Sequence, residues 1–112
     1  MRNGWASCPL TENGFVRIVS QPSFAAPLSA AKAVSVLNDA KEDSDHEFWP
    51  DDISISDASR FDSSLLFKSD AVTDAYLLAL AISRESRLVT LDRLIPVAAV
   101  HGATKEHVFL AD

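Results

Sequence analysis

The sequence predicts one α/β domain over residues 1–112, with a parallel sheet flanked by helices. Three observations support this fold class. Short apolar runs typical of strands alternate with longer segments of helical periodicity, which is the pattern of parallel sheets. The composition is globular, with 47% hydrophobic and 23% charged residues. A length of 112 residues suits one small domain, and no repeat or linker divides the sequence.

The first half of the chain is predicted to contain a strand and two helices. Residues 4–8 form a short apolar run, and Pro9 suits the first turn of a following helix. That helix extends over residues 11–19, although Gly14 weakens it by about 1 kcal/mol relative to alanine. In residues 27–40, apolar side chains recur at three-residue steps, which predicts the second helix.

The second half is predicted to contain three strands and a buried helix. Isoleucine and serine alternate over residues 53–56, which indicates a strand. Thr73 is a candidate cap for a helix that ends near Glu85. This helix is apolar almost all round and should be buried. Apolar runs at 88–91 and 108–110 predict the last two strands.

The net charge of −6 is concentrated in one segment. Residues 39–52 contain seven acids and one base, which together account for the whole imbalance. The chain therefore has no general basic field, which argues against a non-enzymatic nucleic-acid binder but not against a nuclease. The acidic segment is interpreted as a solvated loop, with a docking surface for a basic partner as the alternative.

Cysteine content and hydropathy indicate a soluble, cytoplasmic protein. The longest apolar run, residues 75–82, is far shorter than the ~20 residues of a membrane span. The first 30 residues lack the pattern of a signal peptide. The single cysteine, Cys8, has no partner for an internal disulfide and is interpreted as a small buried residue.

Three acids, Glu12, Asp74 and Asp92, lie in separate short segments. Asp92 directly follows a predicted strand, where open α/β sheets form their sites, and Asp74 opens a helix. Carboxylates gathered in one place repel one another unless a cation neutralises them. Ligands that offer only oxygen suit Mg²⁺ or Mn²⁺. The pattern therefore predicts a metal-dependent hydrolase of phosphodiesters.

Each of these acids also has a plainer interpretation. Asp74 is then a charge at a helix N-terminus, Asp92 a turn residue and Glu12 a surface acid of a helix. The three histidines have no ligand spacing and are interpreted as surface residues.

Three segments of the chain carry distinctive motifs: Cys8–Arg17 (CPLTENGFVR), Thr73–Ala81 (TDAYLLALA) and Leu88–Asp92 (LVTLD). Together they resemble the PIN domain, in particular the VapC-type toxins of bacterial toxin–antitoxin pairs. Phe48-Trp49 followed by Asp51-Asp52-Ile53 also resembles that group. The order and spacing agree over roughly residues 5 to 110.

The resemblance implies a PIN-like three-layer domain and metal-dependent endoribonuclease activity. Glu12, Asp74 and Asp92 match the second, third and fourth acids of the family's cluster. The family's opening strand, with its first Asp, has no counterpart in these 112 residues, so the domain resembles an N-terminally truncated PIN fold. Weak or absent activity is therefore expected.

In the implied mechanism, Asp74 and Asp92 hold one or two Mg²⁺ or Mn²⁺ ions, and Glu12 binds a second ion or orients the attacking water. Further residues are candidates for supporting hydrogen bonds or RNA contacts, with cap, turn, strand and surface ion-pair roles as the alternatives. These candidates are Asn13, Arg17, Thr73, Thr90 and Arg93.

The partners implied are an RNA substrate, a cognate antitoxin and a second copy of the chain. The alternative function is a non-catalytic toxin remnant that binds an antitoxin or self-associates, through an open sheet edge and the side chains of Phe24, Phe48 and Trp49, which are predicted to be exposed. A third reading, a phosphoacceptor receiver, is supported by Lys105 but lacks the early acid pair that it requires.

Overall fold

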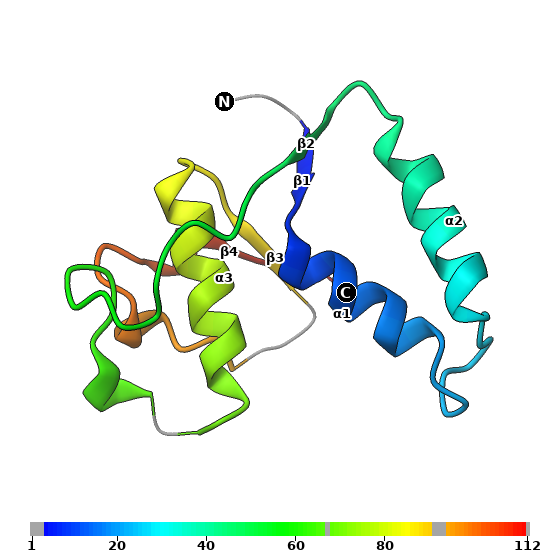
Figure 1. The fold of residues 1–112 in the computed structure, drawn as a ribbon. Coiled ribbons are helices and arrows are strands. Elements are labelled where there is room, and N and C mark those ends of the chain that lie inside the picture. The colour runs from blue at the N-terminus through cyan, green and yellow to red at the C-terminus, as the bar shows by residue number, and fades with distance from the viewer. Residues whose placement is uncertain (1–3, 67, 91–93, 112) are drawn as a thin grey trace. The chain divides into compact units, whose positions relative to one another are not determined.

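The computed structural model describes residues 4–66, 68–90 and 94–111 (Figure 1). The chain divides into two compact units, an N-terminal unit of residues 2–52 and a C-terminal unit of residues 53–112. Each unit is described by itself. Each contains parallel strands and at least one helix, which confirms the predicted α/β class.

Over its described residues, 4–52, the N-terminal unit consists of two strands and two helices. They are β1 (Trp5–Ser7), α1 (Pro9–Val19), α2 (Ala30–Lys41) and β2 (His46–Phe48). β1 pairs with β2 in parallel, with Trp5 opposite His46 and Ser7 opposite Phe48. The predicted strand and both helices are confirmed. The interpretation of residues 39–52 as a loop is wrong at β2, because backbone pairing with β1 makes this short polar segment a strand.

The start of α1 is fixed by side chains from near and far. Pro9 occupies the first helical position, where its missing N–H has no cost. The Thr11 hydroxyl accepts a hydrogen bond from the Cys8 amide at 3.0 Å, and the Asp51 carboxylate accepts one from the Leu10 amide at 3.1 Å. Cys8 is buried, as predicted, and burial raises the pKa of its thiol.

The second helix begins three residues later than predicted, at Ala30. The Ser29 hydroxyl accepts a hydrogen bond from the Lys32 amide at 3.0 Å and thereby caps the helix. The Leu28 amide instead donates to the Val19 carbonyl at 3.0 Å, which ties the preceding loop to the end of α1. A favourable cap and a competing loop contact therefore set this boundary.

Gly4 lies where the backbone before β1 approaches the segment before β2. A Cβ atom built on Gly4 would collide with the backbone carbonyl oxygen of Asp45. The same carbonyl accepts the Trp5 amide at 3.1 Å, so it cannot withdraw without loss of that bond. We expect Gly4→Ala to lower the free energy of unfolding by about 1–3 kcal/mol, the usual cost of overpacking.

Gly14 offers a matched control within the same unit. It lies inside α1, and a Cβ there would meet no atom within 4 Å. Gly14→Ala should therefore raise the free energy of unfolding by about 0.5–1 kcal/mol. Urea unfolding of both variants measures the difference, and equal stability of Gly4→Ala and the unaltered protein would contradict the predicted collision.

The part of the C-terminal unit that the structure describes contains one long helix and one strand pair. The helix α3 (Ala71–Ser83) precedes β3 (Leu88–Thr90) and β4 (Val108–Leu110), which pair in parallel. Single turns of 3-10 helix also occur at Ser63–Leu65, Val97–Ala99 and Lys105–His107. The predicted helix and the last two strands are confirmed over their described residues.

The predicted strand at residues 53–56 is wrong. These residues form a bend and a turn instead. The Ser54 and Ser56 hydroxyls share a hydrogen bond at 2.8 Å, and the Ser54 carbonyl accepts the Asp57 amide at 3.0 Å. Serine side chains that bond locally compete with strand pairing, which overrides the alternating pattern.

The core of the C-terminal unit is built around α3. Phe61, Ala75, Leu78, Ala79 and Val100 form a buried cluster, and each is at most 4% exposed. Apolar residues of β3 and β4 and of the adjacent loops pack against this cluster. The predicted burial of the helix is therefore confirmed.

The predicted cap at Thr73 is wrong, because α3 begins two residues earlier and Thr73 lies inside its first turn. Asp70 occupies the cap position and makes no capping hydrogen bond through its side chain. The preceding turn supplies backbone partners instead, since the Ala71 amide donates to the Lys68 carbonyl at 3.1 Å and the Val72 amide to Ser69 at 3.3 Å.

The end of α3 is a Schellman turn without its usual glycine. The Ser86 amide donates to the Ala81 carbonyl at 2.8 Å, and the Glu85 amide to Ile82 at 2.9 Å. Glu85 therefore has a φ of 55°, in the left-handed region. The helix ends at Ser83 rather than near Glu85 because this turn terminates it.

We expect Glu85→Gly to raise the free energy of unfolding by about 0.5–1 kcal/mol, because glycine adopts this backbone conformation without strain. Arg84→Gly is the matched control, since Arg84 has a φ of −107° and its backbone has no strain that glycine could relieve. Thermal unfolding of the two variants distinguishes them, and destabilisation by Glu85→Gly would contradict the prediction.

No helix within the described ranges is long and apolar enough to cross a membrane.

Candidate metal centre

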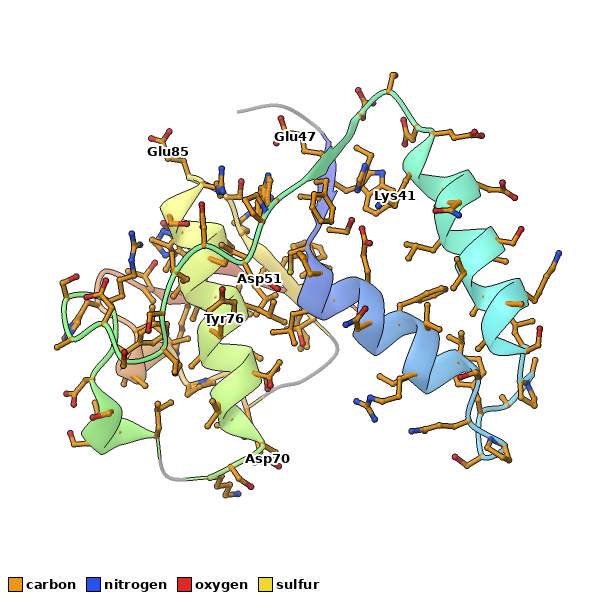
Figure 2. The ribbon with its side chains drawn as sticks, viewed as in Figure 1. Lys41, Glu47, Asp51, Asp70, Tyr76 and Glu85 are labelled. Carbon is orange, nitrogen blue, oxygen red and sulfur yellow. The ribbon has the colours of Figure 1, made fainter. Side chains whose placement is uncertain are left out.

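Glu12 lies in the first turn of α1, just beyond the end of β1. Its Oε2 atom accepts a hydrogen bond from the Ser7 hydroxyl at 2.6 Å and forms an ion pair with Lys41 Nζ at 2.8 Å. Lys41 is the last residue of α2, where Figure 2 labels it. The Glu12 side chain is 16% exposed, so it is partly buried rather than fully exposed.

The surroundings of Glu12 favour its charged form. Partial burial alone would raise the pKa of this carboxyl group. Hydrogen bonds from Lys41 and Ser7, together with attraction to Lys41 and His46, outweigh burial and lower the pKa below its ordinary value. Glu12 is therefore held as a carboxylate at neutral pH, which is the form that binds a metal ion.

His46 is a member of this cluster that the sequence did not reveal. Its Nε2 atom lies 2.8 Å from the Ser7 hydroxyl oxygen. Its ring packs on Trp5, with a centroid separation of 4.4 Å and a tilt of 54°. His46 is partly rather than fully exposed, which corrects its interpretation as a surface residue in part, because the pairing of β1 with β2 brings it beside Ser7.

Asp74 lies in the first turn of α3, in the C-terminal unit, and is partly exposed. The positive end of the helix dipole favours a carboxylate there. Thr73 beside it is exposed, and Thr90 ends β3, where its carbonyl accepts the Ala111 amide at 2.8 Å. The helix N-terminal position predicted for Asp74 is therefore confirmed, while its role as a ligand remains a prediction.

Two predicted site residues, Asp92 and Arg93, lie outside the described residues. Asn13 and Arg17 lie on α1 and are exposed. Over residues 4–66, 68–90 and 94–111, no group of three or more His, Cys, Asp or Glu side chains is placed to hold a metal ion. Glu12 and Asp74 belong to different units, so the structure describes the surroundings of each acid separately.

The donor set itself suits a hard divalent cation. The three predicted acids offer only carboxylate oxygens, the ligands that Mg²⁺ and Mn²⁺ prefer. Of these three acids, Glu12 has the best-defined surroundings, since its neighbours keep it ionised and hold it in one orientation. The chemistry of the residues therefore fits the predicted cofactor.

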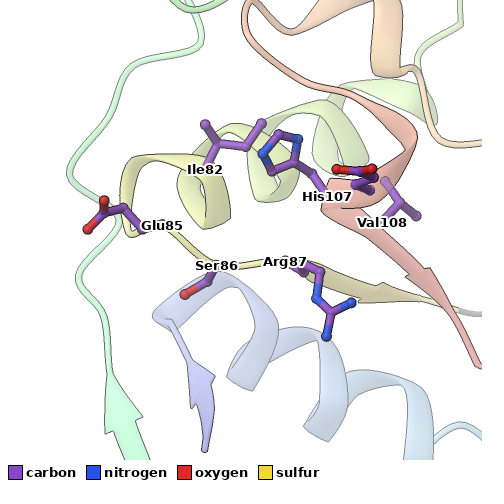
Figure 3. A pocket seen from close by; sticks show the side chains of 7 residues that line it. Ile82, Glu85, Ser86, Arg87, His107 and Val108 are labelled. Atoms are coloured by element: carbon purple, nitrogen blue, oxygen red, sulfur yellow. The ribbon is translucent and has the colours of Figure 1, made fainter. Parts of the chain in front are cut away.

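An open pocket lies at the C-terminal end of α3 (Figure 3). It contains none of the predicted site residues. Its lining comes from the end of α3, the segment that follows it, the 3-10 turn Lys105–His107 and the start of β4: Ile82, Glu85, Ser86, Arg87, Glu106, His107 and Val108. The guanidinium of Arg87 also lies 5.9 Å from the centre of the Phe109 ring.

Several curated ribonucleases of Mycobacterium tuberculosis are similar to this chain. Ribonuclease VapC44 is 49% identical over 107 residues, which span 96% of this chain and 75% of that protein. Ribonuclease VapC39 is 38% identical over 89% of this chain and 73% of its own length. Ribonuclease VapC38 is 43% identical over 80% of this chain and 62% of its own length. No family model matches the chain, and no solved structure matches it.

Identity at this level over nearly the whole chain defines its class. The chain belongs to the VapC family of PIN-domain proteins. The predicted resemblance to VapC-type toxins is thereby confirmed. The three-layer arrangement and the single-domain organisation remain predictions.

Proposed function

We propose that this protein is a divalent-metal-dependent endoribonuclease of the toxin–antitoxin type, which hydrolyses RNA phosphodiester bonds in the cytoplasm. The observation that carries the proposal is 49% identity to ribonuclease VapC44 over 96% of the chain. The ionised and oriented carboxylate of Glu12 supports it, because a metal-dependent hydrolase needs such a group at its centre.

In the proposed site, Asp74 and Asp92 hold one or two Mg²⁺ or Mn²⁺ ions. When bound, such an ion supplies Lewis acidity, which lowers the pKa of a coordinated water and offsets charge on the phosphate. Glu12 would bind a second ion or would accept a hydrogen bond from the attacking water. Either role requires a carboxylate with a fixed orientation, which Ser7 and Lys41 provide.

The remaining predicted residues are proposed to act around this centre. The chain carries a net charge of −6 and offers no general basic field, so binding of RNA phosphates must depend on individual cationic side chains near the site. Arg17 and Arg93 would supply these contacts. Asn13, Thr73 and Thr90 would support the acids through hydrogen bonds.

Removal of the metal tests this proposal. RNA incubated with the purified protein should be cleaved in the presence of Mn²⁺, and an excess of EDTA should abolish the cleavage. Addition of Mn²⁺ in excess over the EDTA should recover the cleavage. Addition of Ca²⁺ instead should recover less of the cleavage, because Ca²⁺ is larger and takes more ligands. Cleavage that continues unchanged in EDTA would contradict the metal dependence.

A second candidate function, antitoxin binding or self-association, is favoured by exposed apolar side chains. Val89 and Phe109 are paired in the β3–β4 register and are 64% and 51% exposed. Phe24 and Phe48 are exposed as predicted. Trp49 is only partly exposed, which corrects that prediction, and its indole N–H donates to Glu47 at 3.1 Å.

Co-purification with a cognate antitoxin, and sedimentation of the isolated protein, test this second function. A complex or a homodimer that Phe109→Ser weakens would support it. A monomer that does not bind the antitoxin would contradict this second function.

A further inference from the structure

The two polar contacts of Glu12 fall on the same oxygen atom. The Ser7 hydroxyl and Lys41 Nζ both reach Oε2, at 2.6 Å and 2.8 Å. Within the described part of the chain, Oε1 accepts no hydrogen bond from a protein group. One oxygen of the carboxylate is therefore held, and the other is left for a ligand.

The direction of the hydrogen bonds follows from the single hydrogen of the Ser7 hydroxyl. A carboxylate can only accept, so Ser7 donates this hydrogen to Glu12. The 2.8 Å contact between Ser7 Oγ and His46 Nε2 must then use the other hydrogen available, which is on His46. His46 thus donates to Ser7, and Ser7 donates to Glu12.

Burial and packing hold this chain of donors in place. Ser7 is only 8% exposed, which limits competition from water for its hydroxyl group. The ring contact with Trp5 fixes the plane of the His46 imidazole. Lys41 Nζ also lies 4.9 Å from the centre of the Phe48 ring, so a second contact holds its charge.

We propose that His46 is a positioning residue for Glu12, acting through Ser7, so that Oε1 of Glu12 is presented to the metal ion or to its bound water. Four elements converge on this carboxylate: β1 supplies Ser7, α1 supplies Glu12 itself, α2 supplies Lys41 and β2 supplies His46. The inference rests on the proposed function, because it assigns His46 a role toward the metal of that site.

The variant that isolates this role is His46→Phe. Phenylalanine keeps an aromatic ring against Trp5 but has no hydrogen to donate to Ser7. We expect Mn²⁺ to bind about 10-fold more weakly, the effect typical of lost groups that orient metal ligands. His46→Gln, which retains an N–H donor, should recover part of the affinity. His101→Phe, at an exposed histidine, is the matched control and should bind Mn²⁺ like the unaltered protein.

A double variant separates positioning from a general effect on folding. If His46 acts through Ser7, then His46→Phe should weaken Mn²⁺ binding little further once Ser7→Ala is present. Calorimetric titration with Mn²⁺ gives the dissociation constants, and unfolding in EDTA verifies that each variant is folded. If the loss of Mn²⁺ affinity in the double variant equalled the product of the losses in the two single variants, the inference would be overturned.

The outcomes also distinguish this inference from the proposed function. If the unaltered protein binds Mn²⁺ and Glu12→Gln weakens binding, but His46→Phe does not, only the role of His46 is overturned. If the unaltered protein itself binds no Mn²⁺, the metal-dependent mechanism fails and the positioning role fails with it.

Discussion

Replacement of Asp74 by asparagine should reduce Mn²⁺-dependent RNA cleavage by about 100-fold or more. The loss of groups that merely orient metal ligands costs about 10–100-fold, and a proposed ligand should cost at least the upper end of that range. Asparagine preserves the shape of the side chain but removes the negative charge that a divalent cation requires. Initial rates on an RNA substrate, measured over a series of Mn²⁺ concentrations, provide the test.

Asp70→Asn is the matched control for this variant. Asp70 lies at the cap position of the same helix and makes no capping hydrogen bond through its side chain. Each substitution removes one negative charge near the N-terminus of the same helix. The interaction of such a charge with the helix dipole contributes at most about 1 kcal/mol, so both variants should fold. Equal cleavage by Asp74→Asn and Asp70→Asn would remove Asp74 from the proposed centre.

Leu78→Ala should lower the free energy of unfolding by about 2–5 kcal/mol. Leu78 is 0% exposed and lies in the cluster with Phe61 and Val100, so truncation leaves a cavity in the centre of the C-terminal unit. A loss of this size is a large part of the about 5–15 kcal/mol that stabilises a typical domain. Urea unfolding followed by circular dichroism measures it.

Leu94→Ala serves as the control because Leu94 is 76% exposed. A substitution at such a surface position should change stability by no more than about 0.5 kcal/mol. If Leu78→Ala and Leu94→Ala were equally stable, the buried cluster around α3 would not be the core that the structure describes.

Elements with a strong local signal were predictable from the sequence. Pro9 marks the start of α1, and the almost wholly apolar segment around Leu78 identifies a buried helix. β2 was missed because His46–Phe48 has no alternation of apolar and polar residues and owes its conformation to pairing with β1. The failed strand at residues 53–56 is the converse, because local serine hydrogen bonds overrode an alternating pattern.

The candidate site divides in the same way. Glu12 and Asp74 were identified by the segments around them, and the comparisons confirm the family of those segments. His46 was not, because its contact with Ser7 joins residues 39 positions apart in the sequence. Lys41 likewise approaches Glu12 from another helix. Contacts of this kind leave no local pattern, so only the folded backbone reveals them.

The parallel pairing of β1 with β2 also determines when the surroundings of Glu12 form during folding. The helices α1 and α2 can form from local contacts, whereas the strand pair must close a loop that contains both of them. Non-local pairing of this kind is intrinsically slow. The Glu12 carboxylate therefore acquires its final surroundings only when β1 and β2 have paired, because Ser7 and His46 lie on these two strands.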